Sequence, residues 1–174
     1  HYTGIALQYM TPTVNTDMVS ESAAPKTFED LLDPKWKSRM AWTTSPSASG
    51  PPGFVGNILM TMGQDKGMDY LRRFAAQQPV AVAASPRAVL DQVIAGEHKL
   101  GVMMYNHHAA ISAAKGAPVE WVKLEPLVAV FSMIGIVQDA PHPNAARLLE
   151  EYIRSTEGQK VFAGFAANAV VNVA

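Results

Sequence analysis

Small hydroxyl residues, a glycine and prolines gather in segment 43–52 (TTSPSASGPP), directly before an apolar helical pattern that opens at Gly53. Backbone N–H groups and hydroxyls just ahead of a helix can bind an anion, because the helix dipole favours negative charge there. Ser47, Ser49 and Gly50 are therefore the first candidate ligand-binding residues. The alternative is an ordinary loop whose serine caps the helix.

A second polar cluster stands at 105–108 (YNHH), where an apolar strand pattern gives way to a helix of small residues. Neutral imidazole is a common metal ligand, so His107 and His108 raise the question of a metal site. Adjacent side chains rarely reach one ion, however, and no Asp, Glu or Cys follows at ligand spacing. A hydrogen-bonding or exposed histidine is therefore favoured over a metal ligand at His107.

Strand and helix patterns alternate along the chain, which predicts an α/β fold: a mixed sheet with helices on both faces. Strands are expected at 5–10, 39–43, 79–83, 99–105, 119–124 and 127–137, and helices at 27–33, 53–62, around 68–75, and at 86–95, 109–115, 144–155 and 157–165. Thr11-Pro12-Thr13 is expected to end the first strand, and a capping box at Thr27 begins a helix of about two turns. Ligands of such sheets lie outside the carboxyl ends of the strands, here at loops 43–52, 84–87 and 105–108.

The amino-acid composition excludes some classes of function. The chain has 174 residues, of which 48% are hydrophobic and 17% charged, and this is enough for a buried core. A net charge of -1 gives no electrostatic case for nucleic acid or an anionic membrane as partner. The absence of cysteine excludes thiolate chemistry, and no segment reaches the ~18 apolar residues that span a bilayer. We expect a soluble protein.

Several segments, in the right order, resemble the extracellular solute-binding proteins of ABC importers, family 1, in the iron-binding-protein-like branch. They are 26–37 (KTFEDLLDPKWK), 96–102 (GEHKLGV), 141–150 (PHPNAARLLE) and 155–159 (STEGQ), and the resemblance covers nearly the whole chain. It implies a type II periplasmic-binding-protein fold, in which two α/β lobes close on a solute held between them. It also implies a periplasmic or extracellular location, no catalytic residues and no cofactor.

The same resemblance divides the chain into parts. Residues 1–125 would form the second, C-terminal lobe, with hinge strands near 5–10 and 119–124. Residues 126–155 would normally pack with a first lobe that this chain lacks, and 156–174 would form a C-terminal helix and tail.

Without a first lobe, the apolar surface that would normally pack against it should be exposed. Phe131, Met133, Ile134 and Ile136 are expected to lie open to water, and large apolar patches tend to be covered by another chain. We therefore expect a swapped or tightly associated homodimer, or a partner fragment. The tryptophans, Trp36, Trp42 and Trp121, are expected to pack in the core or at the hinge.

The resemblance also assigns site residues. Ser47, Ser49 and Gly50 match the family's anion-contacting loop. Ser85 and Arg87 match a second polar contact at a helix start, where Arg87 would hold a carboxylate or phosphate in a forked pair. The alternative for Arg87 is a surface residue on the first turn of its helix.

Ferric-binding members of the family carry two adjacent tyrosines where this chain turns from strand into helix. Asn106 and His107 stand at those two positions here, and Tyr105 comes one place too early. Standard ferric binding is therefore not expected. Tyr105, Asn106 and His107 are retained as candidate ligand-binding residues, with no metal assigned.

The function favoured by the sequence is the substrate-binding component of an ABC transporter, which captures a small anionic or metal-associated solute and delivers it to a membrane permease. One alternative is the effector-binding domain of a transcription regulator, although no DNA-binding helix pair or basic stretch is present. Another is a serine hydrolase that uses a loop serine with His107 or His108 as base. The sequence offers no nucleophile-elbow pattern for that reaction.

Overall fold

A six-stranded mixed sheet in the order β3-β2-β4-β1-β5, with β6 paired to β1, organises the molecule. The computed structural model describes residues 2–45 and 49–165, and for 162–165 the backbone alone. The strands are β1 (Tyr2–Asn15), β2 (Met40–Thr43), β3 (Val80–Val82), β4 (Leu100–Tyr105), β5 (Val119–Trp121) and β6 (Val128–Gly135). The helices are α1 (Gly50–Met62), α2 (Gln64–Ala76), α3 (Pro86–Ile94), α4 (Asn106–Ala114), α5 (Pro143–Arg154) and α6 (Thr156–Phe165), with 3-10 turns η1 (Glu21–Ala23), η2 (Glu29–Leu32) and η3 (Pro34–Trp36). None of these described helices is long and apolar enough to cross a membrane.

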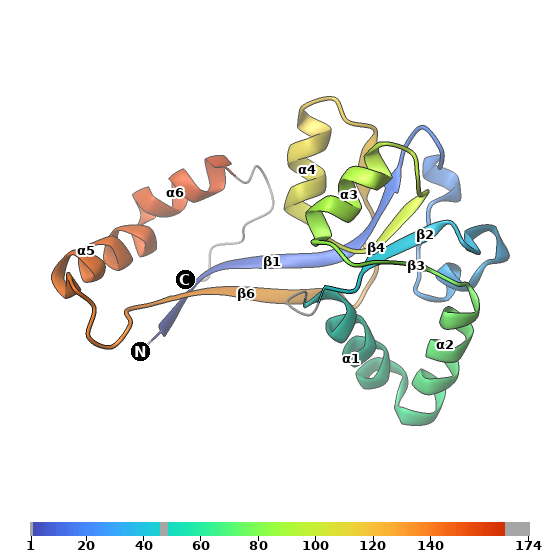
Figure 1. Ribbon diagram of the computed structural model, residues 1–174, viewed down its shortest axis with the longest axis horizontal. Coiled ribbons are helices and arrows are strands. Elements are labelled where there is room, and N and C mark those ends of the chain that lie inside the picture. The colour runs from blue at the N-terminus through green and yellow to red at the C-terminus, as the bar shows by residue number, and fades with distance from the viewer. Residues whose placement is uncertain (1, 46–48, 166–174) are drawn as a thin grey trace.

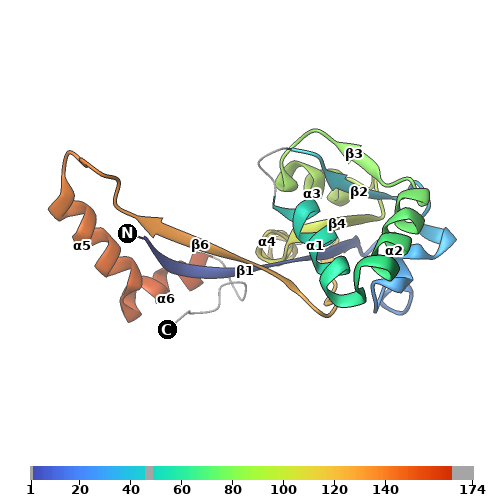
Figure 2. The same cartoon turned by 90° about the horizontal axis from the view of Figure 1, so that it is seen from below.

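Strand β1 connects two parts of the molecule. Its C-terminal half pairs antiparallel with β4 on one side and β5 on the other. Its N-terminal half pairs only with β6, from Tyr2 opposite Gly135 to Met10 opposite Val128. Figures 1 and 2 show β1 and β6 leaving the main lobe side by side as a long two-stranded ribbon that leads to α5 and α6. The buried Gln159 side chain holds α6 to this ribbon by donating to the Ile5 carbonyl at 3.1 Å.

Helices cover both faces of the main sheet, as the alternating pattern predicts. On one face, Phe54 of α1 and Tyr70 and Phe74 of α2 form the centre of the larger core. On the other face, Val89, Leu90 and Val93 of α3 pack with Ala41 and Met104. The mixed sheet with helices on both sides is therefore confirmed (Figure 1).

A bulge in the β1–β4 pair decides which way the end of β4 faces. Thr11 pairs with Met104 and Thr13 with Gly101, so two residues of β4 stand opposite Pro12. Proline has no N–H to give to the ladder and is tolerated at such an irregularity. The first strand therefore does not end at 11–13, as expected from the sequence, but continues to Asn15.

The bulge also changes the alternation of side chains along β4. Val102 and Met103 are adjacent, yet both join the larger core on the α1 side, and Met104 joins the smaller core on the α3 side. Because successive side chains of a strand alternate after the bulge, Tyr105 returns to the α1 side. This residue packs against the larger core there.

The prediction of an α-helix at 27–33 is wrong, because the helical turns there are of the 3-10 type. The capping box exists, since Thr27 N–H donates to Asp30 at 2.9 Å and Asp30 N–H donates to Thr27 Oγ1 at 3.3 Å. The Asp33 side chain then accepts from Lys35 N–H at 2.9 Å and begins a new turn with Pro34. Two short 3-10 segments, η2 and η3, result in place of one α-helix.

Several boundaries also differ from those expected. Helix α1 begins at Gly50 rather than Gly53, and α4 begins at Asn106 rather than Ala109. β5 ends at Trp121, three residues before the expected end at 124, and β6 ends at Gly135 rather than 137. The glycines expected to close helices are confirmed by their left-handed backbone, with φ of 80° at Gly63 and Gly96 and 85° at Gly116.

Gly50 is required where α1 meets the sheet. An added Cβ would lie 2.9 Å from Met10 Cε, 3.1 Å from Met103 Cβ and 3.2 Å from the Met103 carbonyl oxygen. We predict that Gly50→Ala lowers the free energy of unfolding by about 1–3 kcal/mol through this overpacking. Urea denaturation measures the change.

Gly56 in the interior of α1 is the matched control, because an added Cβ there meets no heavy atom within 4 Å. Gly56→Ala should raise the free energy of unfolding by about 0.5–1 kcal/mol through helix propensity. Equal stability of the Gly50→Ala and Gly56→Ala variants would contradict the close approach at Gly50.

Candidate functional site

The carboxyl ends of β2, β3 and β4 lie at one edge of the sheet, because these strands run parallel. Backbone and side-chain bonds join the loops that follow β2 and β3. Thr43 Oγ1 donates to the Ala84 carbonyl and accepts from Ser45 N–H at 3.1 Å, and Thr44 N–H donates to the Val82 carbonyl at 2.8 Å. Two of the three loops singled out in the sequence are therefore held together.

Ser49 directs its hydroxyl toward β4 and β1. Its Oγ lies 3.2 Å from the Tyr105 hydroxyl and 3.6 Å from Met10 Sδ. It makes no side-chain cap on α1 and has helical backbone angles itself. The capping role that the sequence left open is therefore not the role of Ser49, and Ser47 lies outside the described residues.

The start of α1 offers fewer amide donors than the sequence argument assumed. Pro51 and Pro52 have no N–H, and Gly53 N–H donates to the Ser49 carbonyl at 3.0 Å. Within the first turn, this leaves the amide of Gly50 for an anion. The prolines that mark this loop in the sequence thus weaken the binding mechanism inferred from it.

The start of α4 offers more backbone N–H donors than the start of α1. The first N–H groups of a helix have no acceptor inside the helix, and no side chain caps this one at Tyr105. The amides of Asn106, His107 and His108 therefore have no acceptor within the helix, and they follow directly on Tyr105, whose hydroxyl meets Ser49. Asn106 is buried at 4% exposure, and its Oδ1 accepts from Tyr9 N–H at 3.3 Å, which fixes α4 to β1.

His107 and His108 pack beside the Tyr105 ring. Their ring centroids are 4.3 Å apart, and each lies 5.4 Å from the centroid of Tyr105. Both Nδ1 atoms are buried and have no hydrogen-bond partner among the described residues. Buried nitrogens without a partner are uncommon in folded proteins, so this cluster is a candidate functional feature.

Burial keeps both imidazoles neutral at neutral pH. It lowers the pKa of His107, and it lowers the pKa of His108 to about 4, with smaller contributions from the charges of His107 and Arg87. A neutral imidazole has one donor and one acceptor nitrogen. No group of three His, Cys, Asp or Glu side chains that would hold a metal ion occurs in the described part of the chain.

Ser85 and Arg87 stand at the start of α3. Ser85 Oγ accepts from Ala88 N–H at 3.3 Å, so the helix cap expected there is confirmed. Arg87 uses its guanidinium within the protein: Nη2 lies 2.7 Å from Asp91 Oδ1, and Nη1 donates to Ser112 Oγ at 3.0 Å. Arg87 therefore ties α3 to α4, and its forked contact is with these side chains.

The structure thus brings together five of the residues predicted from the sequence: Ser49, Gly50, Tyr105, Asn106 and His107. Arg87 joins them indirectly, through its bond to Ser112 of α4, whereas Ser85 caps α3. From the sequence, His108 was considered as a metal ligand or a base but was not placed in the ligand site, and Met10 and Ser112 were not singled out. Met10 stands in an apolar run that marks it as core, and Ser112 differs in no visible way from other helix serines, so only the adjacency of His108 to His107 was a usable signal.

Comparison with known proteins gives a consistent result. The family model described as bacterial extracellular solute-binding protein matches residues 1–173. The Fe(3+)-binding periplasmic protein of Serratia marcescens is 26% identical over 166 residues, which are 91% of this chain and 48% of the relative. The chain therefore spans about half the length of this curated relative.

Solved structures share the fold. The periplasmic binding protein AfuA from Actinobacillus pleuropneumoniae, with exogenous fructose-6-phosphate bound, has a TM-score of 0.76 and 22% identity, over 98% of this chain and 55% of its own. A Trichodesmium protein (IdiA, FutA) in complex with iron and citrate ligands has a TM-score of 0.75 and 20% identity, over 99% of this chain and 57% of its own. The α/β lobe expected from the sequence is confirmed.

The lowered histidine pKa predicts a dependence of stability on pH. An unfolded histidine binds a proton near pH 6.5 and the folded His108 near pH 4, so the unfolded state binds more protons between these values. Stability should therefore fall as the pH drops from about 6.5 to about 4. His108→Gln should remove part of this fall, measured as urea midpoints at several pH values.

His142→Gln is the control, because His142 is an exposed histidine next to α5. Its pH profile should match that of the unmodified protein. An unchanged acid slope in His108→Gln would show that the burial of His108 has no thermodynamic consequence.

Proposed function

The chain belongs to the bacterial extracellular solute-binding proteins, and on that premise we propose that it forms part of the solute receptor of an ABC importer. The receptor captures a small solute in the periplasm or outside the cell and delivers it to a membrane permease. The solute is an oxyanion, or a metal ion carried by an oxyanionic chelator.

The observation that carries this proposal is the uncapped start of α4 facing Tyr105 and Ser49. Amides, two hydroxyls and two neutral imidazoles meet at one edge of the sheet. Such groups bind oxygen anions through hydrogen bonds, helped by the dipole of α4. The residues that meet there, Ser49, Gly50 and 105–108, include no carboxylate, so nothing among them repels negative charge.

The relatives support the class of solute. Fructose-6-phosphate and citrate, named with two structural neighbours, both present anionic oxygens. The Serratia relative is named for Fe(3+), but this chain has Asn106 and His107 at the positions of the two adjacent tyrosines that the resemblance assigns to ferric-binding members, and its one phenol, Tyr105, comes one residue earlier. A chelated metal or a phosphate-bearing or carboxylate-bearing solute therefore suits the residues better than a bare ferric ion.

A hydrolase receives no support from the geometry. The hydroxyl of Ser49 meets Tyr105 and Met10. Among the described residues, no hydrogen bond joins a histidine ring to this serine, as a serine nucleophile and its base would require. Solute binding without catalysis is the function we propose.

We further propose that residues 1–125 form the second lobe of a two-lobed receptor, with hinge strands near 5–10 and 119–124. Residues 126–155 would then pack against a first lobe, and 156–174 would complete the C-terminal end. Exposed apolar side chains support this division. On β6, Phe131 is 55% exposed and Met133 60% exposed.

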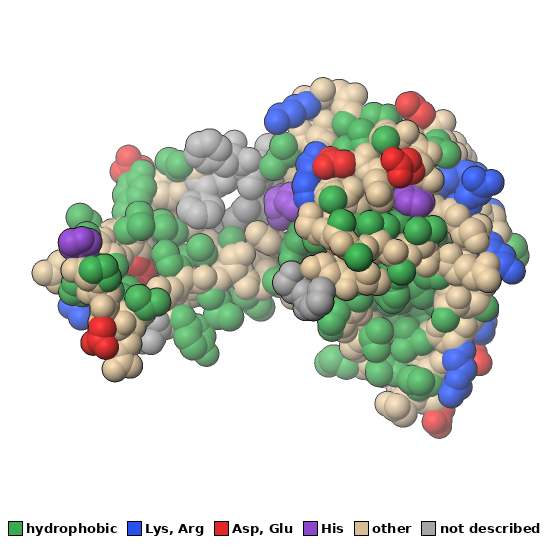
Figure 3. All heavy atoms as spheres, viewed as in Figure 1, with side chains coloured by type: hydrophobic (Ala, Val, Ile, Leu, Met, Phe, Trp, Pro, Cys, Tyr) green, Lys and Arg blue, Asp and Glu red, His purple; other side chains and the backbone are tan. Residues whose placement is uncertain are grey.

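Helix α5 adds to the same apolar surface. None of its residues is buried, and Leu148, Leu149 and Tyr152 are 69%, 55% and 44% exposed. Figure 3 shows hydrophobic side chains gathered over the ribbon and α5. Ile134 and Ile136, expected to lie open to water, are half-buried. For Ile134 the reason is that side chains of β6 alternate between the two faces of the ribbon.

Tyr105 provides a direct test of the solute site. Citrate, ferric citrate and fructose-6-phosphate are offered to the full-length protein, and at least one should raise its melting temperature through preferential binding to the folded state. Tyr105→Phe should weaken that binding about tenfold, the value of one hydrogen bond to a charged group. Isothermal titration calorimetry measures both affinities.

Tyr152→Phe makes the same chemical change on α5 and should bind as tightly as the unmodified protein. If none of the three oxyanions binds, the proposed class of solute is wrong. If one binds and Tyr105→Phe binds it equally well, the solute lies elsewhere.

The apolar surface predicts self-association of the 174-residue chain by itself. At micromolar concentration, light scattering should give a homodimer or a larger species, because Phe131 and Met133 are exposed in the described part of the chain. Phe131→Lys should shift the population toward the monomer. Met60→Lys is the control, since Met60 is 89% exposed but lies on α1; a clean monomer for the unmodified chain would refute the prediction.

A further inference from the structure

His107 and His108 are the groups of the proposed solute site that can change charge near neutral pH. They are the second and third residues of α4, the helix whose first N–H groups have no acceptor inside the helix. Side chains of a helix tilt toward its N-terminus, and one turn is about 5.4 Å long. An anion bound by the first turn of α4 therefore lies close to both imidazoles.

Each imidazole keeps one accessible nitrogen. The two Nδ1 atoms are buried without a partner, whereas neither Nε2 atom is buried or hydrogen-bonded within the described residues. A proton from solvent can therefore reach either ring at Nε2 without entering the core. Protonation of the pair depends on electrostatics and not on access.

The surroundings of the pair oppose protonation while no anion is bound. Burial is the largest cause of the lowered pKa of both rings, and the charges of His107 and Arg87 lower the pKa of His108 further. The positive end of the α4 dipole also repels a cation at the start of the helix. All of these effects except burial are electrostatic and can be offset by a nearby negative charge.

No neighbouring element supplies that negative charge from its own side chains. On α3, Asp91 faces His108 but is held by Arg87 at 2.7 Å. Helix α4 itself contains no Asp, Glu, Lys or Arg. From β4 and the adjoining part of β1 come the phenols of Tyr105 and Tyr9, which are neutral near pH 7.

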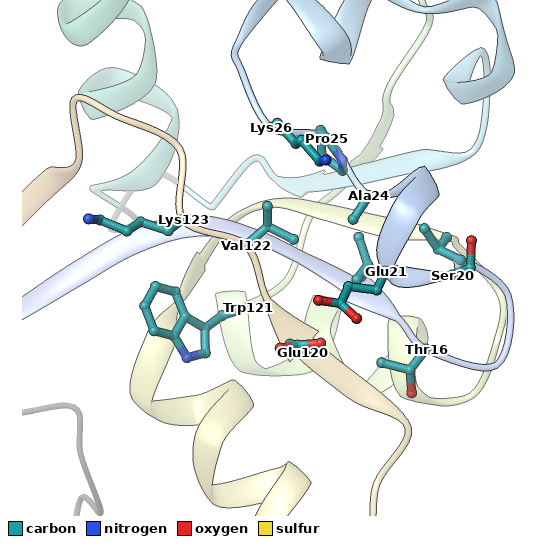
Figure 4. A pocket seen from close by; sticks show the side chains of 12 residues that line it. Thr16, Ser20, Glu21, Ala24, Pro25, Lys26, Glu120, Trp121, Val122 and Lys123 are labelled. Atoms are coloured by element: carbon teal, nitrogen blue, oxygen red, sulfur yellow. The ribbon is translucent and has the colours of Figure 1, made fainter.

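Strand β5 also packs against α4, and its one carboxylate is directed away from the pair. Figure 4 shows Glu120 beside Glu21 of the η1 turn, whereas the next residue, Trp121, lies on the side of α4. Successive side chains of a strand point to opposite faces, which accounts for this difference. Among the described residues, Asp91 is thus the carboxylate whose charge acts on His108, and Arg87 compensates it.

We propose that binding of an anionic solute at the start of α4 is coupled to uptake of a proton by the pair His107 and His108. The inference rests on the proposed function, because the solute brings the negative charge that draws the proton in. The proton comes from solvent, and no bond of the solute breaks. About one proton is expected per solute, since two charged rings with centroids 4.3 Å apart would repel each other.

The direction of the pH dependence follows from linkage. An anion within about 4–6 Å raises the pKa of an imidazole by roughly 1–3 pH units, so the bound state holds more protons than the free state between the two pKa values. Solute affinity should therefore rise as the pH falls through this window. The pKa of about 4 for His108 sets the lower end of the window.

NMR of the imidazole Cε1–H signals tests the coupling directly. The full-length protein is titrated with acid in the presence and absence of saturating fructose-6-phosphate or citrate. The midpoint of His107, of His108 or of both should rise by at least about one pH unit when the solute is bound. The exposed His142, next to α5, should titrate at the same pH in both samples.

Calorimetry of a double variant provides a second measurement. The affinity of the unmodified protein, relative to that of the double variant His107→Gln and His108→Gln, should rise about tenfold from about pH 7.5 to about pH 5.5. Ionisation of the solute affects both proteins equally and cancels in this ratio. His142→Gln should follow the unmodified protein at every pH.

The outcomes separate this inference from the proposed function. Unchanged histidine midpoints with a solute bound would overturn the coupling and leave solute binding intact. The same pH dependence of affinity with and without the two histidines would do so as well. If neither citrate, ferric citrate nor fructose-6-phosphate binds, the proposed function fails and the coupling fails with it. If only the double variant does not bind, the histidine midpoints of the unmodified protein decide.

Discussion

The register of β1 against β4 is the constraint on which the rest of the structure depends. A proline in the middle of a paired strand cannot donate to its neighbour, so two residues of β4 face Pro12 and the side-chain alternation of β4 shifts by one. Without that shift, Tyr105 would face α3 and Met104 would face α1. With it, the phenol of Tyr105 reaches Ser49, and the proposed solute-binding edge has a hydroxyl pair at its centre.

The close approach at Gly50 follows from the same register. Val102 and Met103 both face the larger core, and Met103 with Met10 leaves no room for a side chain at the first residue of α1. Helix α1 therefore lies directly against β1 and β4, and its start is held beside the start of α4. The hydroxyls and amides of two loops distant in the sequence meet because one strand carries an extra residue.

Much of the fold follows from local pattern, and the failures have identifiable causes. Ser85, Gly63, Gly96 and Gly116 act at the helix ends where they were expected, because capping and left-handed backbone depend on a few adjacent residues. The continuation of β1 through Pro12 was not predictable in this way, since it depends on pairing with β4, which lies far along the chain.

For the candidate site, too, local features were predictable and long-range contacts were not. Its residues could be named from the sequence because polar groups stand where strands turn into helices. The contacts of Arg87 with Ser112 and of Asn106 with Tyr9 were not found, because they join elements whose packing no local pattern specifies.

Within this edge, Arg87 is already held by Asp91, and both histidines are neutral at neutral pH. A solute here meets dipoles and hydrogen-bond donors without a free positive charge, so tight binding requires that water be excluded from the other side. In the proposed two-lobed receptor, a second surface closing over this edge would supply that exclusion.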